Sequence, residues 1–237
     1  MTRRVVLDTE TTGLDPAQGH RVIEIGCVEL AGRQLTERRF HSYLNPQREI
    51  DAGAMQVHGI SNERVAGEPL FASIAADLVE FIRDAELVIH NAAFDIGFLN
   101  AEFALLEMGP VKDICPNITD TLKMAREMRP GRRNSLDALC KDYGIDNSNR
   151  QLHGALLDAE LLAEVYLAMT RGQESLMMDL EAPVASGAAV ASGNRAPLRV
   201  LRASADELVE HERVLKEIAK DSKGKCVWQA EPAATVS

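Results

Sequence analysis

Residues 5–13 read VVLDTETTG, an apolar run that continues directly into two carboxylates. Such a run followed by Thr-Gly predicts a buried strand that ends in a turn. Side chains alternate between the two faces of a strand, so Asp8 and Glu10 point the same way. Two like charges on one face near a core are costly unless something positive lies between them. The stretch therefore predicts a core strand whose two acids need a positive partner.

The chain around this strand predicts an α/β fold. Residues 21–30 and the 40–44 region read as two more strands, and the short turns between them favour an antiparallel meander. Further along, the spacing of apolar residues predicts one short strand and four helices. The strand covers 86–90 and the helices cover 71–83, 91 to about 108, 135–143 and 154–170. Strands followed by strand–helix alternation indicate a mixed sheet, an antiparallel meander plus parallel strands, flanked by helices.

Composition and charge exclude some classes of protein. The 237 residues are 46% hydrophobic and 26% charged, enough for one well-buried domain plus extra segments. The 4% of aromatic residues argues against a binder that stacks bases on rows of aromatic rings. The net charge of −10 argues against a broad basic surface, although it leaves room for a nucleic acid held through metal ions.

Cysteine spacing and hydropathy indicate the compartment. The four cysteines form no CxxC pair, so reduced thiols are expected rather than a disulfide framework or a zinc ribbon. The chain shows neither a signal-peptide pattern nor an apolar run of membrane-spanning length. We therefore expect a cytoplasmic protein with no membrane contact. The cysteines are Cys27, Cys115, Cys140 and Cys226.

Three more residues of catalytic type stand far along the chain from the acid pair. Asp95 lies early in the helix that follows strand 86–90, and Asp158 interrupts the apolar run of helix 154–170. His153 precedes Asp158 by five positions. Each residue alone has a plain structural explanation, since acids near helix starts complement the dipole and a histidine there often caps or packs. Their joint occurrence with Asp8 and Glu10 is what indicates a site.

Together these stretches resemble the DEDDh, or DnaQ-like, family of 3′–5′ exonucleases. The resemblance covers residues 4–172 and, within the family, is to the replicative proofreading enzymes of bacteria. It rests on LDTETTG (7–13), HNAAFDIGFL (90–99), LHGALLDAELLAEVY (152–166) and the connecting RRNSLDALC (132–140). It implies a ribonuclease H-like fold and hydrolysis of the last phosphodiester at a 3′ end, with release of a nucleoside 5′-monophosphate.

The resemblance also implies that the positive partner of Asp8 and Glu10 is a pair of divalent metal ions, Mg²⁺ or Mn²⁺. Asp8, Glu10 and Asp158 would ligate the metals, with Asp8 bridging the two, and Asp95 would hold the second ion. His153 would be the general base, because imidazole titrates near neutral pH. Five helical residues turn through about 500°, so we expect His153 in the loop before the helix rather than on the helix face of Asp158.

Contacts to the terminal nucleotide are implied for a wider set of residues. Some relatives carry an acid where Gly53 stands, so this position offers no side-chain contact here. His58 is either a ligand contact or a turn residue before Gly59. The candidate substrate contacts are Asp8, Glu10, Thr11, Thr12, Gly13, Gly53, His58, Asn91 and Asp158.

The densest basic stretch lies between the second and third acidic motifs. It is either a solvated loop or a set of phosphate contacts along the strand that leads to the site. Its members are Lys123, Arg126, Arg129, Arg132 and Arg133.

The remainder of the chain predicts a tether. Gln173–Met178 resembles a weak sliding-clamp-binding peptide without the final aromatic residue, and 182–197 has the composition of a flexible linker. A capping box at 204–207 opens a helix that either folds back on the main domain or docks on a partner. The resemblance implies that 198–237 binds the alpha subunit of DNA polymerase III, which would keep the exonuclease concentrated near the primer end. The sequence leaves open whether a small accessory subunit covers the exonuclease domain.

The expected organisation is an exonuclease domain at 1–172, a clamp motif and linker at 173–197, and a polymerase-binding segment at 198–237. Three functions compete. A proofreading DNA exonuclease and an RNA-trimming enzyme would use the same catalytic residues, but the linker and terminal helix favour the first. A non-catalytic replisome scaffold is disfavoured because the four acids and His153 are all present, whereas a scaffold could lose any of them.

Overall fold

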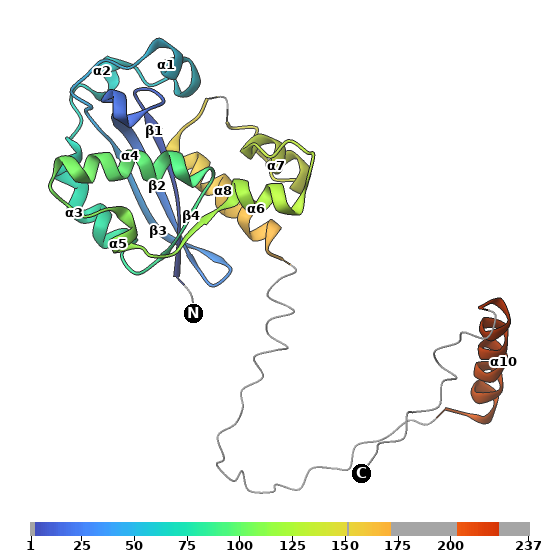
Figure 1. Cartoon of the computed structure of the whole chain (residues 1–237). Helices are drawn as coiled ribbons and strands as arrows, with labels where there is room; N and C mark the ends of the chain where they lie inside the picture. Colours follow the sequence, from blue (N-terminus) through green and yellow to red (C-terminus); the bar gives the residue numbers. More distant parts are fainter. Residues whose placement is uncertain (1–2, 151, 172–202, 223–237) are drawn as a thin grey trace, which may run out of the picture. The chain divides into compact units, whose positions relative to one another are not determined.

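The computed structural model describes residues 3–150, 152–171 and 203–222 (Figure 1). Contacts divide the chain into two units, Met1–Ala182 and Pro183–Ser237, and each is described by itself. The predicted clamp motif and linker lie outside the described residues. The predicted boundaries at 172 and 197 fall in the same segment and stay predictions.

The first unit is built on a five-stranded sheet in the order β3-β2-β1-β4-β5. The strands β1, β2 and β3 pair antiparallel, and β4 and β5 extend the sheet in parallel from β1. The predicted mixed sheet, a meander plus parallel strands, is therefore confirmed. The strands are β1 Arg3–Thr11, β2 Val22–Ala31, β3 Gln34–Tyr43, β4 Glu86–Ile89 and β5 Ile118–Asp120.

Helices flank this sheet, and the four longer predictions are confirmed as α3, α4, α7 and α8. Helix α7 shows why: the Ser135 hydroxyl accepts a hydrogen bond from the Ala138 N–H, and Gly144 ends the helix in the left-handed region at φ 69°. The sequence does not predict the other four helices, α1, α2, α5 and α6, because one or two turns give apolar spacing little room to repeat. The helices are α1 Ala52–His58, α2 Asn62–Val65, α3 Phe71–Ile82, α4 Ala92–Leu105, α5 Val111–Ile114, α6 Thr121–Met128, α7 Leu136–Tyr143 and α8 Ala155–Met169, with a 3₁₀ turn η1 at Pro16–Gln18.

Strand β1 is buried on both faces. Its odd-numbered residues Val5 and Leu7 belong to a core shared with α3 and α4, whereas Val6 belongs to a second core shared with α7 and α8. Fully burying an aliphatic side chain stabilises the fold by roughly 1.5–3 kcal/mol, so both layers hold the strand in place. The even-numbered face of β1 is therefore turned towards α8.

The second unit contains helix α10, Ala205–Asp221. Its predicted capping box is confirmed, because Ser204 and Glu207 exchange side-chain and backbone hydrogen bonds. The apolar residues Leu208, Val209 and Ile218 of this helix are exposed.

Two expectations about the environment of the chain can be compared with the structure. Cys27, Cys115 and Cys140 are buried free thiols, as a reduced protein requires. In the part of the chain that the structure describes, no helix has both the length and the apolar character needed to cross a membrane.

Candidate active site

Asp8 and Glu10 lie on the face of β1 that is turned towards α8, as strand alternation predicts. On the neighbouring strand β2, Gly26 pairs with Asp8 and Glu24 pairs with Glu10. A Cβ atom at Gly26 would lie 2.3 Å from the backbone of Ala155, the first residue of α8. The absence of a side chain at Gly26 therefore allows the start of α8 to approach the sheet beside the acid pair.

Glu24 fastens α8 at this point. Its buried carboxylate accepts a hydrogen bond of 3.1 Å from the Ala155 N–H through Oε2 and contacts His41 Nε2 at 2.7 Å through Oε1. An acceptor with negative charge at a helix N-terminus satisfies an otherwise unpaired N–H and complements the helix dipole. The contact fixes the first turn of α8, which carries Asp158, above Asp8 and Glu10.

Asp95 reaches the same end of β1 from the opposite layer. It is buried in the first turn of α4, and its Oδ1 accepts a hydrogen bond of 2.7 Å from the Thr9 hydroxyl. Asn91 precedes α4 in the left-handed region at φ 66°, with no side-chain capping bond among the described residues. The backbone turn at Asn91, rather than a cap, therefore places Asp95 beside the acid pair.

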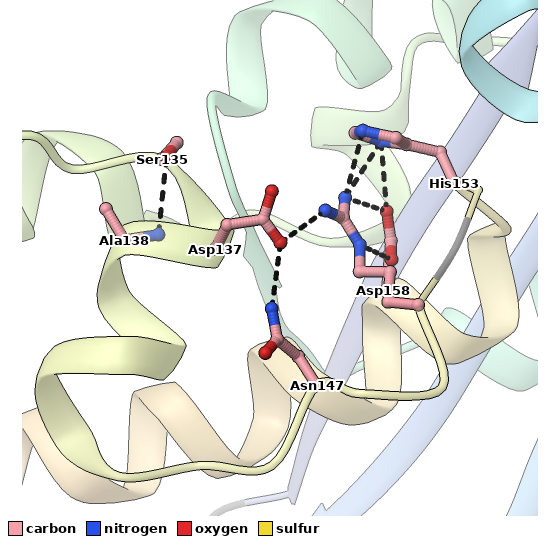
Figure 2. A network of polar contacts seen from close by, with 7 residues as sticks. Ser135, Asp137, Ala138, Asn147, His153 and Asp158 are labelled. Atoms are coloured by element: carbon pink, nitrogen blue, oxygen red, sulfur yellow. Dashed lines mark hydrogen bonds and ion pairs between the residues drawn. The ribbon is translucent and has the colours of Figure 1, made fainter.

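Asp158 is held by two basic side chains. Arg150 donates Nε to Oδ1 at 2.5 Å and Nη2 to Oδ2 at 2.6 Å, and His153 Nδ1 lies 3.3 Å from Oδ2. His153 lies in the loop before α8, as expected, and its side chain is 44% exposed. Arg150 also donates to Asp137 at 2.7 Å, which ties the loop to α7; Figure 2 shows this network of polar contacts.

The acids repel one another in a buried setting. Burial, followed by the charges of Asp95 and Glu10, raises the pKa of Asp8 well above its usual value. Burial and the nearby Asp158 raise the pKa of Glu10 to about 8, and burial raises the pKa of Asp95 to about 7. Burial also acts to raise the pKa of Asp158, but hydrogen bonds from Arg150 and His153 bring it below its usual value. When all four acids are ionised, their negative charge exceeds the positive charge of the side chains around them.

The donor set fits a divalent cation. Glu10, His153 and Asp158 each offer one ligand atom, and the three atoms lie within 4.8 Å of one another. Hard cations prefer carboxylate oxygens, and a bound cation would offset the burial and the mutual repulsion that raise the pKa values of Asp8 and Glu10.

One pocket of about 670 Å³ brings most of the predicted residues together. Its size lies in the range of small-molecule and cofactor sites. The predicted site residues in its lining are Asp8, Glu10, Asn91, Asp95, His153 and Asp158. Two members of the basic stretch, Arg126 and Arg132, also line it, whereas Arg129 is paired with Asp142. The sequence reasoning does not find the other lining residues, which include Thr9, His90, Phe94, Asn134 and Arg150.

The predicted contacts Thr11, Thr12, Gly13, Gly53 and His58 are not among the residues that line this pocket. The Thr12 hydroxyl lies 3.0 Å from a ring nitrogen of His20, whose ring fills the space that a side chain at Gly13 would need.

The end of α1 flanks the catalytic loop, because the His153 N–H donates to the Val57 carbonyl at 3.2 Å. His58 is buried, and its Nε2 has no hydrogen-bond partner within the described residues. Burial lowers its pKa. Contact of these residues with a nucleotide stays a prediction.

Comparisons with known proteins agree with this geometry. The sequence model of the RNase_T exonuclease family matches residues 5–166. The chain is 49% identical to the DNA polymerase III subunit epsilon of Pasteurella multocida, over 96% of this chain and 94% of that one. It is also 49% identical to the same subunit of Escherichia coli, over 97% and 98% of the two chains.

Solved structures confirm the ribonuclease H-like exonuclease fold. Exonuclease X in complex with 5′ overhanging duplex DNA superposes with a TM-score of 0.56 at 25% identity, covering 72% of this chain and 93% of that chain. The nuclease domain of 3′hExo, a DEDDh family member bound to rAMP, gives a TM-score of 0.62 at 18% identity over 72% and 92%. With its exonuclease domain and its match to nearly full-length relatives, the chain belongs to the family of DNA polymerase III epsilon subunits.

Proposed function

We propose that the pocket is the active site of a proofreading 3′–5′ exonuclease that removes mismatched nucleotides from a DNA 3′ end as nucleoside 5′-monophosphates. The observation that carries the proposal is the convergence of Asp8, Glu10, Asp95 and Asp158 on one pocket, with His153 at its wall. These residues come from β1, α4, α8 and the loop before α8.

Two divalent ions, Mg²⁺ or Mn²⁺, are proposed as cofactors. Asp8, Glu10, Asp95 and Asp158 would hold them. When bound, such ions stabilise the charge on the attacking and leaving oxygens of an in-line phosphodiester displacement. His153 takes the proton of the attacking water, which its partly exposed position at the pocket wall allows.

The basic stretch supports a path for the substrate strand. Arg126 and Arg132 line the active-site pocket, and Arg132 also lines an adjoining depression with Arg133 and Lys141. Exposed arginine and lysine side chains thus lie in the pocket and in the depression beside it. They could contact successive phosphates of a nucleic-acid strand whose last nucleotide occupies the pocket. We therefore favour phosphate contact over a merely solvated loop.

The proposed partners follow from family membership and from the second unit of the chain. We propose that 198–237 binds the alpha subunit of the polymerase, with the exposed apolar residues Leu208, Val209 and Ile218 of α10 as part of the contact. Gln173–Met178 is proposed to contact the sliding clamp. These roles belong in the cytoplasm, where a bacterial chromosome is replicated.

The test is nuclease activity with paired substrates. The purified chain with Mg²⁺ is expected to release nucleoside monophosphates from a mismatched 3′ DNA end, and the Asp8→Ala variant is expected to lose this activity. Asp77→Ala, which changes an exposed aspartate on α3, is the matched control. A matching RNA oligonucleotide tests the RNA-trimming alternative, which faster hydrolysis of RNA would favour. Undiminished release by Asp8→Ala would contradict the assignment of the site.

A further inference from the structure

Arg150 lies inside the acid cluster with only 5% of its side chain exposed. Its guanidinium spans three partners. It holds both oxygens of Asp158, donates Nη1 to Asp137 Oδ1 at 2.7 Å, and places Nη2 2.8 Å from His153 Nδ1. A buried arginine is tolerated only where its charge is paired and its N–H groups are satisfied, and here the acid cluster supplies most of that compensation.

The contacts of Arg150 engage the atoms that the proposed chemistry needs. The fork on Asp158 uses both carboxylate oxygens, which are the donors that a metal ion would require. Arg150 Nη2 also lies 2.8 Å from His153 Nδ1 and 3.4 Å from His153 Nε2, so the guanidinium contacts the imidazole ring as well as Asp158. One side chain holds both a metal-ligand candidate and the base candidate.

We propose that Arg150 is a positioning residue that serves as the built-in counter-cation of the metal-free site and competes with divalent metal for Asp158. This inference rests on the proposed function, because it takes Asp158 as a metal ligand. Loading of the site by a divalent cation then requires the guanidinium to give up part of its hold on Asp158. The same release moves the guanidinium away from the His153 ring, which it contacts in this structure.

Competition makes a signed prediction for metal affinity. The Arg150→Gln variant keeps a polar side chain, although a shorter one, and removes the positive charge. Two unit charges about 4 Å apart change a binding equilibrium by roughly fivefold in water and by about a thousandfold at an effective dielectric constant near 20, so a tenfold effect lies at the solvent-screened end of this range. We therefore expect Mn²⁺ to bind Arg150→Gln about tenfold more tightly than the wild-type chain. Arg150→Lys, which keeps the charge, is expected to stay close to wild type.

The experiment is a calorimetric titration of the full chain with Mn²⁺ in the absence of nucleic acid, so its readout does not depend on activity. Arg83→Gln is the matched control, because Arg83 is exposed and does not line the pocket, so the affinity of this variant for Mn²⁺ is expected to equal that of the wild-type chain. Thermal unfolding gives the second readout. Without metal, Arg150→Gln should melt below wild type, and Mn²⁺ should raise its Tm by more than it raises that of wild type.

The outcomes separate this inference from the proposed function. Unchanged or weaker Mn²⁺ binding by Arg150→Gln would overturn competition and would make Arg150 a support for the bound metal's ligand. Tighter binding by Arg150→Lys, equal to that of Arg150→Gln, would overturn the role of the charge. Absence of Mn²⁺ binding by the wild-type chain would instead contradict the proposed metal site itself.

Discussion

Glu24 on β2 accepts a hydrogen bond of 3.1 Å from the backbone N–H of Ala155, and this contact joins the sheet to the first turn of α8. The two residues lie far apart in the chain, yet their contact determines where Asp158 stands relative to the acids of β1. The same carboxylate faces Glu10 across the strands. The placement of the site thus depends on a residue that we assign no chemical role.

Replacing Glu24 by Ala is expected to weaken both the fold and the activity. The change leaves the Ala155 N–H and His41 without their acceptor, at a cost of about 1–3 kcal/mol in the free energy of unfolding. Urea denaturation measures that loss, and single-turnover hydrolysis measures the displacement of Asp158. Glu37→Ala, on the exposed side of β3, should change neither.

Replacing Gly26 by Ala introduces a methyl group where the backbone of Ala155 lies 2.3 Å away. Because backbone cannot move aside as a flexible side chain can, α8 must shift, at a cost of roughly 1–3 kcal/mol of stability. We expect a lower Tm and a fall in kcat, measured on the same preparation. The control is Gly67→Ala, since no described atom lies within 4 Å of a Cβ at that position. Equal Tm values for the two variants would argue against the close approach.

The metal-free chain should lose stability as the pH rises from acidic to mildly alkaline. Glu10 and Asp95 have folded-state pKa values of about 8 and about 7, above their values in an unfolded chain. The folded state therefore holds more protons than the unfolded state over this range, and stability falls as pH passes through the folded-state pKa values. Thermal unfolding in EDTA at pH values from about 5 to about 8.5 measures the slope. Glu10→Gln should flatten it, and a wild-type Tm that rises with pH would contradict the prediction.

Arg132→Ala is expected to weaken substrate binding rather than chemistry. If Arg132 contacts a phosphate, its loss raises KM with little change in kcat and reduces the slope of log affinity against log salt by about 1. Steady-state kinetics at several salt concentrations provide both numbers. Arg38→Ala, on β3, serves as the control. A fall in kcat at constant KM would assign Arg132 to the chemistry instead.

Deletion of 173–237 should leave hydrolysis of free oligonucleotides intact and end co-elution with the alpha subunit. The site residues all lie within the first unit, whereas the proposed polymerase contact lies in the second. Gel filtration of the mixed proteins measures the association. Co-elution of the shortened chain would show that the polymerase contact lies within 1–172.

The spacing of apolar residues predicted the part of the fold in which that spacing repeats. Helices α3, α4 and α8 were predictable because their apolar spacing persists over several turns, and the eight-residue α7 was predictable because Ser135 and Gly144 mark its two ends. Strand β5 was not predicted, because it has only three residues. Strand β3 was predicted only in its 40–44 region, because most of its residues are exposed and polar, and its pairing with β2 defines its full length. Helices α1, α2, α5 and α6 were missed because each contains only one or two turns.

The site shows a similar division. Strand alternation alone placed Asp8 and Glu10 on one face, and the family resemblance added Asp95, His153 and Asp158. Arg150 could not be found in this way, because NSNRQ at 147–151 looks like an ordinary polar loop. Its hydrogen bonds to Asp137 and Asp158 come from tertiary packing, which no local pattern encodes.

Strand β1 presents Thr9 to Asp95 on one layer and its even-numbered acids to α8 on the other. A slip of a single residue in its pairing would exchange these two sets of side chains. Core leucines and valines would then move out of their layers at the same moment as the carboxylates left the pocket. Catalytic competence and correct strand alignment are consequently one property, and a misaligned folding product of this chain would be both unstable and inert.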